Sequence, residues 1–381
     1  MSIEGEIGVT LHWDGSRVRH LTLASTRPLA AARVLLGRSP GDAAALVPRL
    51  YALCGHAQGA ACAAALRAAG AGDDGVPAVA GWTVALEALQ ETLWRLLVDA
   101  PRWLSLPPQL ALAAPARAAV AQAVAALQAQ PAQPRPALVD AAAVLGDIAQ
   151  QHVYGGDPVA WLSNADAAAF DHWRDHTNTL PARALALLAA TAPSLGRSDT
   201  ALMPGLDDSA WESAVVPALL QDPLFAQAPT WGGRPVETGA LARCRDQPLV
   251  AALIARDGHS AATRLAARLV EAAALLRDLA TADGDAVGWV RAWPLGAGLG
   301  LAAVQTARGL LLHLVRLADG RIADYRIVAP TEWNFHPQGA LFRGIVGTSA
   351  PDDTTLRART GLAVQALDPC VGFRVEVVRD A

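Results

Sequence analysis

The feature that most constrains this chain is a change of hydrophobic periodicity near residue 285. From about Leu29 to Ala280 the pattern is mostly helical, interrupted by Pro-, Gly- and Asp-rich breaks. After Asp285 the pattern becomes that of strands, over residues 287–293, 299–304, 310–317 and 322–328. Helices and strands in separate blocks predict an α+β fold, dominated by helices, with a small antiparallel sheet in the C-terminal third.

Turn dipeptides place two hairpins. Asp319-Gly320 separates the last two predicted strands, and Asp14-Gly15 separates strand-like segments at Ile7–Trp13 and Val18–Leu23. Both dipeptides tolerate the positive φ of a tight turn. A second small hairpin is therefore expected near the N-terminus.

Two helices are predicted with clear boundaries. In residues 260–280, one face carries Leu265, Leu269, Ala272 and Leu276, while Arg264, Arg268 and Arg277 lie elsewhere on the helix. A last helix is expected over residues 352–367, with Asp352 or Asp353 as its N-cap. Pro369 ends it just before Cys370.

Composition excludes several classes of protein. The chain has 381 residues, 52% of them hydrophobic and 17% charged, so it can bury a sizeable core and is not disordered. Its net charge of −4, with no basic block, argues against a nucleic-acid partner. The N-terminus has no export signal, and Pro115 and Arg117 interrupt the most apolar stretch. We expect a cytoplasmic protein with no membrane insertion.

The four cysteines are Cys54, Cys62, Cys244 and Cys370, and none forms a CxxC pair. In a reducing compartment they are expected to be free thiols. A zinc ribbon or a cysteine-rich cluster is therefore not predicted.

Four segments, in order along the chain, resemble the large subunit of nickel–iron hydrogenases. Arg33–Cys62 resembles the segment that ends in that family's first cysteine motif. PVETGALAR at residues 235–243 is similar to E-x-G-P-L-A-R, with Ala240 in place of proline. Residues 304–334 contain VQTARGLLLH, a hairpin and APTEWN, and Asp368-Pro369-Cys370 matches the start of the last motif. The resemblance implies a single hydrogenase large-subunit-like domain over residues 1–381.

The departures from that family concern its metal ligands. The resemblance implies two cysteine pairs, in which the first member binds nickel and the second bridges nickel and iron. Cys54 and Cys370 match the first members, whereas Ala57 and Phe373 stand at the second. Two metals need soft thiolate bridges to be held close together. No stable nickel is therefore expected, and an active hydrogenase with unusual ligands is the least favoured interpretation.

With these losses the chain resembles the hydrogenase expression and formation proteins of the HupK/HoxV type. That resemblance implies a non-enzymatic maturation scaffold, which binds an Fe(CN)2(CO) fragment transiently and passes it to the hydrogenase large-subunit precursor. The implied partners are that precursor and maturation chaperones of the HypC/HypD type. The alternative is a metal-free docking module that mimics the large subunit.

The resemblance also implies site residues. Cys54 and Cys370 would be the metal ligands. Arg308 matches an arginine beside the diatomic ligands of the iron, and Pro330 and Thr331 match the segment whose hydroxyl bonds a cyanide. A guanidinium has fixed donors and a permanent charge, which suit an anionic complex.

Purely structural roles stay open for several of these residues. Cys54 and Cys370 are otherwise small core residues, and Arg308 otherwise pairs with a carboxylate such as Glu332 or Glu376. His56 is either a substitute ligand or a histidine at a helix start. Four further polar residues in the matched segments are expected to order the structure around the site: Glu237, Arg243, Gln305 and His313.

Overall fold

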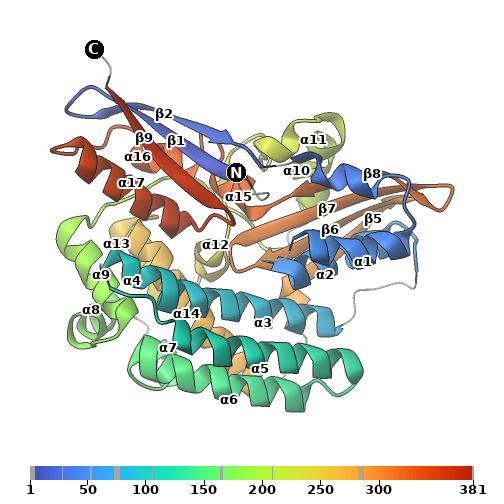
Figure 1. Cartoon of the computed structure of the whole chain (residues 1–381), viewed down its shortest axis with the longest axis horizontal. Coiled ribbons are helices and arrows are strands. Elements are labelled where there is room, and N and C mark those ends of the chain that lie inside the picture. Colours follow the sequence, from blue (N-terminus) through green and yellow to red (C-terminus); the bar gives the residue numbers. More distant parts are fainter. Residues whose placement is uncertain are drawn as a thin grey trace.

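The predicted helical and extended blocks form separate layers in the computed structural model (Figure 1). The structure describes residues 5–27, 29–51, 54–72, 78–104, 106–163, 166–207, 209–282 and 287–379. The α+β class predicted from periodicity is confirmed. Helices occupy most of the chain before residue 282, and four consecutive strands follow residue 287.

The first sheet joins the two ends of the chain. β1 (Glu6–Trp13) and β2 (Val18–Ser25) form the predicted antiparallel hairpin. β9 (Gly372–Arg379) then pairs with β1 in parallel, giving the strand order β2-β1-β9. The predicted N-terminal hairpin is therefore confirmed, and the sheet also contains a third strand, not predicted from sequence, that returns from the far end of the chain.

The second sheet is antiparallel, as predicted. Its strands are β5 (Val290–Gly296), β6 (Leu299–Thr306), β7 (Gly309–Ala318) and β8 (Arg321–Val328), in sequential order. β5 begins later than predicted, because residues 287–289 form a short 3-10 turn. Every residue of β6 is buried, since the sheet is covered on both faces.

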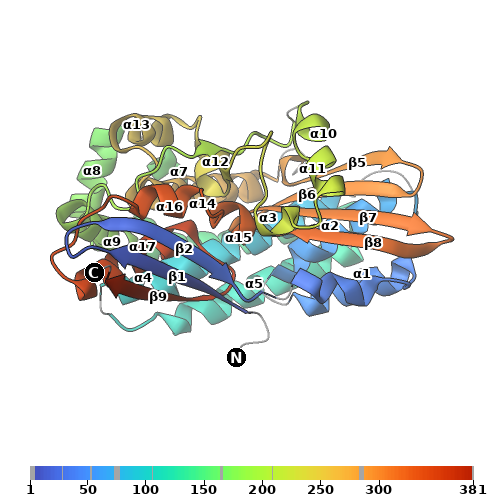
Figure 2. The same ribbon diagram turned by 90° about the horizontal axis from the view of Figure 1, so that it is seen from above.

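Helices from different parts of the chain cover those two faces (Figure 2). α1 (Pro40–Leu50) and α2 (Gly55–Ala68) lie on one face, and α10 (Trp211–Ala214) and α11 (Val216–Gln221) on the other. Gly300 of β6 allows α2 to lie directly on the strand, because a Cβ there would fall 2.2 Å from the Ala65 carbonyl oxygen. This close approach fixes the position of α2, and with it the cysteine at its start.

α14 (Ala261–Thr281) is the central helix, and its predicted boundaries are confirmed. The Ser260 hydroxyl caps it by accepting the backbone N–H of Thr263. Arg264 and Arg268, expected away from the apolar face, are both buried. The helices that pack against α14 are α3 (Ala78–Trp94), α6 (Arg135–Ala149), α7 (Pro158–Leu162), α9 (Leu180–Thr191), α12 (Ala240–Cys244), α13 (Pro248–Asp257) and α17 (Asp353–Leu367).

α5 (Leu110–Ala129) is the apolar stretch that we judged a poor membrane span. Among the described residues it is the one helix long and apolar enough to cross a membrane by length and composition. In the structure it packs between α3 and α6, and buries Ala116, Val120, Val124 and Leu127 on one face.

α17 positions the last cysteine. Asp352 caps the helix by accepting the Thr355 N–H, as predicted. The helix ends at Leu367, and Asp368 takes a left-handed conformation with φ of 57°. Such a φ is uncommon outside glycine, although aspartate tolerates it better than most residues. The turn directs the chain through Pro369 and Cys370 into β9.

The remaining α-helices and strands are α4 (Ala100–Trp103), α8 (Ala167–His176), α15 (Pro330–Asn334), α16 (Ala340–Ile345), β3 (Ala201–Leu202) and β4 (Val236–Glu237).

Candidate functional site

Cys54 stands at the start of α2, where its side chain makes no capping hydrogen bond. The capping role belongs instead to Glu87 of α3, whose two carboxylate oxygens accept the backbone N–H groups of His56 and Ala57 at 2.9 Å each. Burial raises the pKa of Glu87 to about 7, against the effect of these two hydrogen bonds. Because a neighbouring helix caps α2, the Cys54 sulfur is left for other contacts.

Cys370 lies in the turn between α17 and β9, and Thr331 of α15 holds it. The Thr331 hydroxyl accepts the Cys370 backbone N–H at 3.2 Å, and its oxygen lies 2.7 Å from the Cys370 sulfur. Pro330 is the first residue of α15, where a missing N–H costs nothing. Thr331 therefore contacts Cys370 directly, and Pro330 precedes it in the chain.

The structure brings Cys54 and Cys370 together from distant parts of the chain. Burial raises the pKa of the Cys54 thiol to about 12, and the next contribution is the charge of Cys370. Cys54 is thus protonated at neutral pH, and any metal that binds it must displace that proton. Among the described residues, no group of three His, Cys, Asp or Glu side chains is arranged to hold a metal ion.

Arg308 occupies the turn between β6 and β7. Its Nη2 lies 2.8 Å from Glu91, and its Nε lies 3.7 Å from Asp368. Burial lowers the pKa of Arg308, but the charges of Asp368, Cys370 and Glu91 raise it above its ordinary value. Arg308 does pair with carboxylates, but not with the two that we considered. Glu332 pairs with Arg27, and Glu376 with Arg374.

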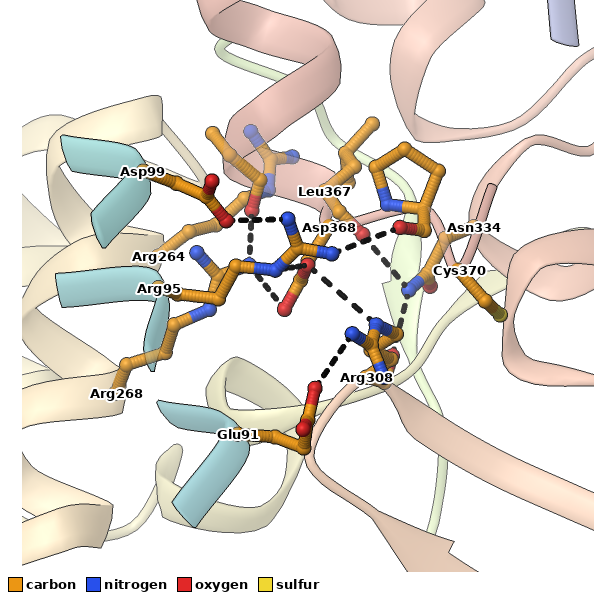
Figure 3. Close-up of polar contacts among 12 residues, drawn as sticks. Glu91, Arg95, Asp99, Arg264, Arg268, Arg308, Asn334, Leu367, Asp368 and Cys370 are labelled. Atoms are coloured by element: carbon orange, nitrogen blue, oxygen red, sulfur yellow. Dashed lines mark hydrogen bonds and ion pairs between the residues drawn. The ribbon is translucent and has the colours of Figure 1, made fainter. Parts of the chain in front are cut away.

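Asp368 is the centre of a buried ionic network (Figure 3). Arg95 lies 2.7 Å from its carboxylate, and Arg268 and Arg308 each lie 3.7 Å away. The charges of these three arginines lower the pKa of Asp368, although burial alone raises it. Arg95, in a π-helical turn after α3, also donates to the Pro369 carbonyl at 3.1 Å. The network therefore fixes the two residues before Cys370.

A second hydrogen-bonded chain reaches Cys54 from the sheet. His313 of β7 lies 2.8 Å from the Tyr325 hydroxyl and 2.9 Å from the Gln58 oxygen. Since the Gln58 oxygen only accepts, the His313 Nε2 carries the proton and its Nδ1 accepts from Tyr325. The Gln58 amide nitrogen then donates to the Cys54 sulfur at 3.8 Å. His313 thus orders the sheet against α2, in line with its expected role.

The remaining polar residues singled out by sequence serve separate contacts. Glu237 makes a buried ion pair with Arg264, and Arg243 binds both Glu271 and Gln305. These are two structural pairs, and not one shared network. The side chain of His56 is exposed, and its backbone N–H is bound to Glu87.

The two residues at the positions where the resemblance implies a second cysteine lie in apolar surroundings. Ala57 is fully buried in α2. Phe373 of β9 packs with the cluster between the first sheet and α17, and its ring approaches Gly361.

Sequence reasoning missed four residues near the sulfurs: Arg27, Tyr51, Gln58 and Glu87. The charge of Arg27 acts on both cysteines, and the pKa of Tyr51 is raised mainly by burial, with a smaller contribution from Cys54. The sequence around each of them is typical of an ordinary helix or of the end of a helix or strand, so no local pattern marks it as a residue of the site. Their proximity depends on tertiary packing.

Comparison with known proteins identifies the family of the chain. The family model described as nickel-dependent hydrogenase matches residues 222–371. The chain is 34% identical to the hydrogenase expression/formation protein HoxV of Cupriavidus necator, over 93% of this chain and 92% of that one. It is 31% identical to the hydrogenase expression/formation protein HupK of Rhizobium leguminosarum bv. viciae, over 98% and 96%.

Solved structures extend the agreement to the fold. The Ni-Fe-Se hydrogenase of Desulfovibrio vulgaris Hildenborough superposes with a TM-score of 0.57 over 93% of each chain, at 17% identity. The predicted hydrogenase large-subunit-like fold is therefore confirmed. Since the identity to HoxV and HupK extends over nearly the whole chain, this protein belongs to the family of hydrogenase expression/formation proteins that includes HoxV and HupK.

Proposed function

We propose that this protein acts in hydrogenase formation as a carrier and not as an enzyme. It binds an Fe(CN)2(CO) fragment through Cys54 and Cys370 and passes it to the hydrogenase large-subunit precursor. The observation that carries the proposal is that the two cysteines lie close enough for their charges to act on each other and on Arg308, with Thr331 in contact with Cys370. Family membership supports the broader role in hydrogenase formation.

The donor set suits this cargo. Cyanide and carbon monoxide supply three ligands to the iron themselves, so two protein thiolates are enough to hold the fragment. Thiolates are soft donors suited to such a metal centre. The absence of a third metal-binding side chain among the described residues is therefore compatible with the proposal.

The residues beside the sulfurs are suited to an anionic, diatomic cargo. Arg308 keeps its charge in a buried position, and a guanidinium can donate to cyanide nitrogens. Thr331 has one hydroxyl proton, which it gives either to the Cys370 sulfur or to a cyanide. With Pro330 it forms the wall next to Cys370.

Two sulfurs hold metal less firmly than four, which favours release to the next protein. We therefore expect no stable nickel. The donor and acceptor would be maturation chaperones of the HypC/HypD type and the large-subunit precursor. The exchange would take place in the cytoplasm, where free thiols persist.

Replacement of single cysteines tests the proposal in cells that lack the natural gene. Cys54→Ala and Cys370→Ala should each abolish the iron that co-purifies with the protein and impair maturation of the large subunit. Cys244→Ala is the matched control, because that cysteine is free and buried in the helical core. Normal maturation with both Cys54→Ala and Cys370→Ala would reject the carrier.

A metal-free docking module is the second candidate. It is favoured by one observation, namely that Arg308 and Asp368 already have charged partners within the protein. The buried charges of Arg308 and Asp368 are thus paired within the protein even when no cargo is bound. In that case maturation partners would co-purify equally with the wild type and with a protein lacking both cysteines.

A further inference from the structure

Arg27 has no part in the proposal above, although it is partly buried and close enough to the candidate ligands for its charge to act on them. We propose that Arg27 is a second positioning cation at the two cysteines, held by Glu332 and able to bind the anionic cargo together with Arg308. This inference rests on the proposed function. It also assigns a role to the N-terminal hairpin, which otherwise lies outside the site.

The hairpin delivers Arg27 in a defined position. The Thr26 N–H donates to the Glu6 carbonyl at 3.0 Å, and the Glu6 N–H donates to the Thr26 hydroxyl at 2.9 Å. Gly5 has a φ of +80°, and a Cβ there would fall 2.6 Å from the Arg27 Cα. Only glycine allows the two segments to approach this closely. Arg27 is therefore placed by backbone contacts and not by a mobile tail.

The side chain of Arg27 makes a single buried ion pair. Its Nη1 lies 2.6 and 2.8 Å from the two oxygens of Glu332, and the side chains are 15% and 7% exposed. Within the described ranges, its other guanidinium nitrogens have no hydrogen-bond partner. Glu332 directly follows Thr331, whose hydroxyl holds Cys370. The guanidinium is close enough for its charge to act on both Cys370 and Cys54.

Charge balance explains why two cations are needed. In a ferrous fragment, two cyanides neutralise the iron, so the two cysteine thiolates give the bound complex two negative charges. Arg308 shares its charge with Glu91 and Asp368, whereas Arg27 has one carboxylate partner. The charge of Arg27 is therefore less neutralised by neighbouring carboxylates than that of Arg308, and attracts an anionic cargo more strongly.

Glu332 would compete with the cargo for the guanidinium. The Glu332 carboxylate binds Nη1 and partly neutralises the guanidinium, which weakens the binding of an anion to the remaining Arg27 donors and aids release. Glu332→Gln should therefore retain the fragment at least as well as the wild type does, because it removes the competing charge and leaves Arg27 in place.

The test compares two variants that differ only at Arg27. Arg27→Gln alone would leave the Glu332 carboxylate buried without a partner, so loss of cargo could reflect misfolding. The double variant Arg27→Gln/Glu332→Gln replaces both charges by neutral amides, and its reference is Glu332→Gln. Arg19→Gln is the control from the same hairpin, because Arg19 is exposed and pairs with Asp14. Each protein is purified from cells with an intact cofactor-synthesis pathway.

Iron content, cyanide and carbonyl stretching bands and the thermal unfolding midpoint are measured for each. Relative to Glu332→Gln, the double variant should lose about tenfold in iron occupancy at limiting supply, the effect of one charged hydrogen bond. Any remaining cyanide bands should shift, while Arg19→Gln matches the wild type. Equal occupancy and equal bands in the double variant and Glu332→Gln would overturn the role of Arg27 and leave the carrier proposal standing. Absence of bands from the wild type would instead refute the carrier proposal itself.

Discussion

At the scale of single residues, the site depends on which hydrogen-bonding groups are already engaged. Thr331 serves Cys370 twice, once through the backbone N–H and once at the sulfur. The sulfur of Cys54 receives a hydrogen bond from Gln58, which His313 holds from behind. Each candidate ligand therefore has a supporting residue that sets its orientation.

Thr331→Val tests the support of Cys370. The variant keeps the shape of the side chain but leaves the Cys370 N–H without its acceptor, which should lower the free energy of unfolding by about 1–3 kcal/mol. Thr331→Ser keeps the hydroxyl and should lose less. We expect Cys370 to be alkylated faster in Thr331→Val, as measured by mass spectrometry. Equal alkylation rates in both variants and the wild type would show that the hydroxyl does not hold the sulfur.

His313 predicts a pH dependence of stability. Burial lowers its pKa to about 3, below the ordinary value of 6.5. Below about pH 6.5 the His313 imidazole is protonated in the unfolded chain but stays neutral in the folded protein. The free energy of unfolding therefore decreases as the pH falls below about 6.5. Between pH 7 and pH 4.5 the loss should reach about 2–3 kcal/mol.

Urea unfolding at both pH values measures this effect, with His313→Gln as the comparison. The variant cannot titrate at this position, so its stability should fall less over the same range. An identical fall in both proteins would assign the acid sensitivity to other groups.

At the scale of elements, α2 depends on a cap from another helix. Glu87 accepts two N–H groups of the first turn of α2, at the point where Cys54 begins the helix. Glu87→Leu removes both acceptors and should lower the free energy of unfolding by about 1–3 kcal/mol. Glu87→Gln keeps one oxygen acceptor and should fall in between. Chemical denaturation measures both, and full stability of Glu87→Leu would show that water caps the helix equally well.

Sequence alone predicts the elements with strong local signals. Ser260 and Asp352 are capping residues in front of helical patterns, and both helices begin where expected. Asp14-Gly15 and Asp319-Gly320 likewise mark real turns. β9 lies outside the predicted strands, although Phe373, Val375 and Val377 alternate with charged residues in the manner of a strand. Its parallel pairing with β1 has no local signal at all.

The candidate site is predictable only in part for the same reason. Cys54, Cys370, Arg308 and Thr331 come from motif resemblance, and the structure brings them together. The partners of Arg308 were not predictable, because Glu91 of α3 and Asp368 after α17 meet it only through tertiary packing. Arg268 shows the general difficulty. Helical periodicity predicts that Arg268 lies on the surface. In the structure it is buried, because its charge is paired with the buried carboxylate of Asp368.

At the scale of the whole molecule, the two ends of the chain close the site. Arg27 follows β2, and Cys370 lies between α17 and β9. β1, β2 and β9 lie side by side in Figure 1. The β6–β7 turn belongs to the second sheet, and α2 is a helix that packs on one face of that sheet. The site therefore draws on both sheets, because Cys370 leads into β9, which pairs with β1, whereas Cys54 begins a helix that lies on the second sheet.

The central claim is that two sulfurs from distant parts of the chain hold one iron fragment. Infrared spectra of the protein, purified from cells that make the cofactor, test it most directly. The wild type should show two cyanide stretches and one carbonyl stretch, and Cys54→Ser/Cys370→Ser should show none. A double variant that keeps all three bands, or a wild type that lacks them, would contradict the account.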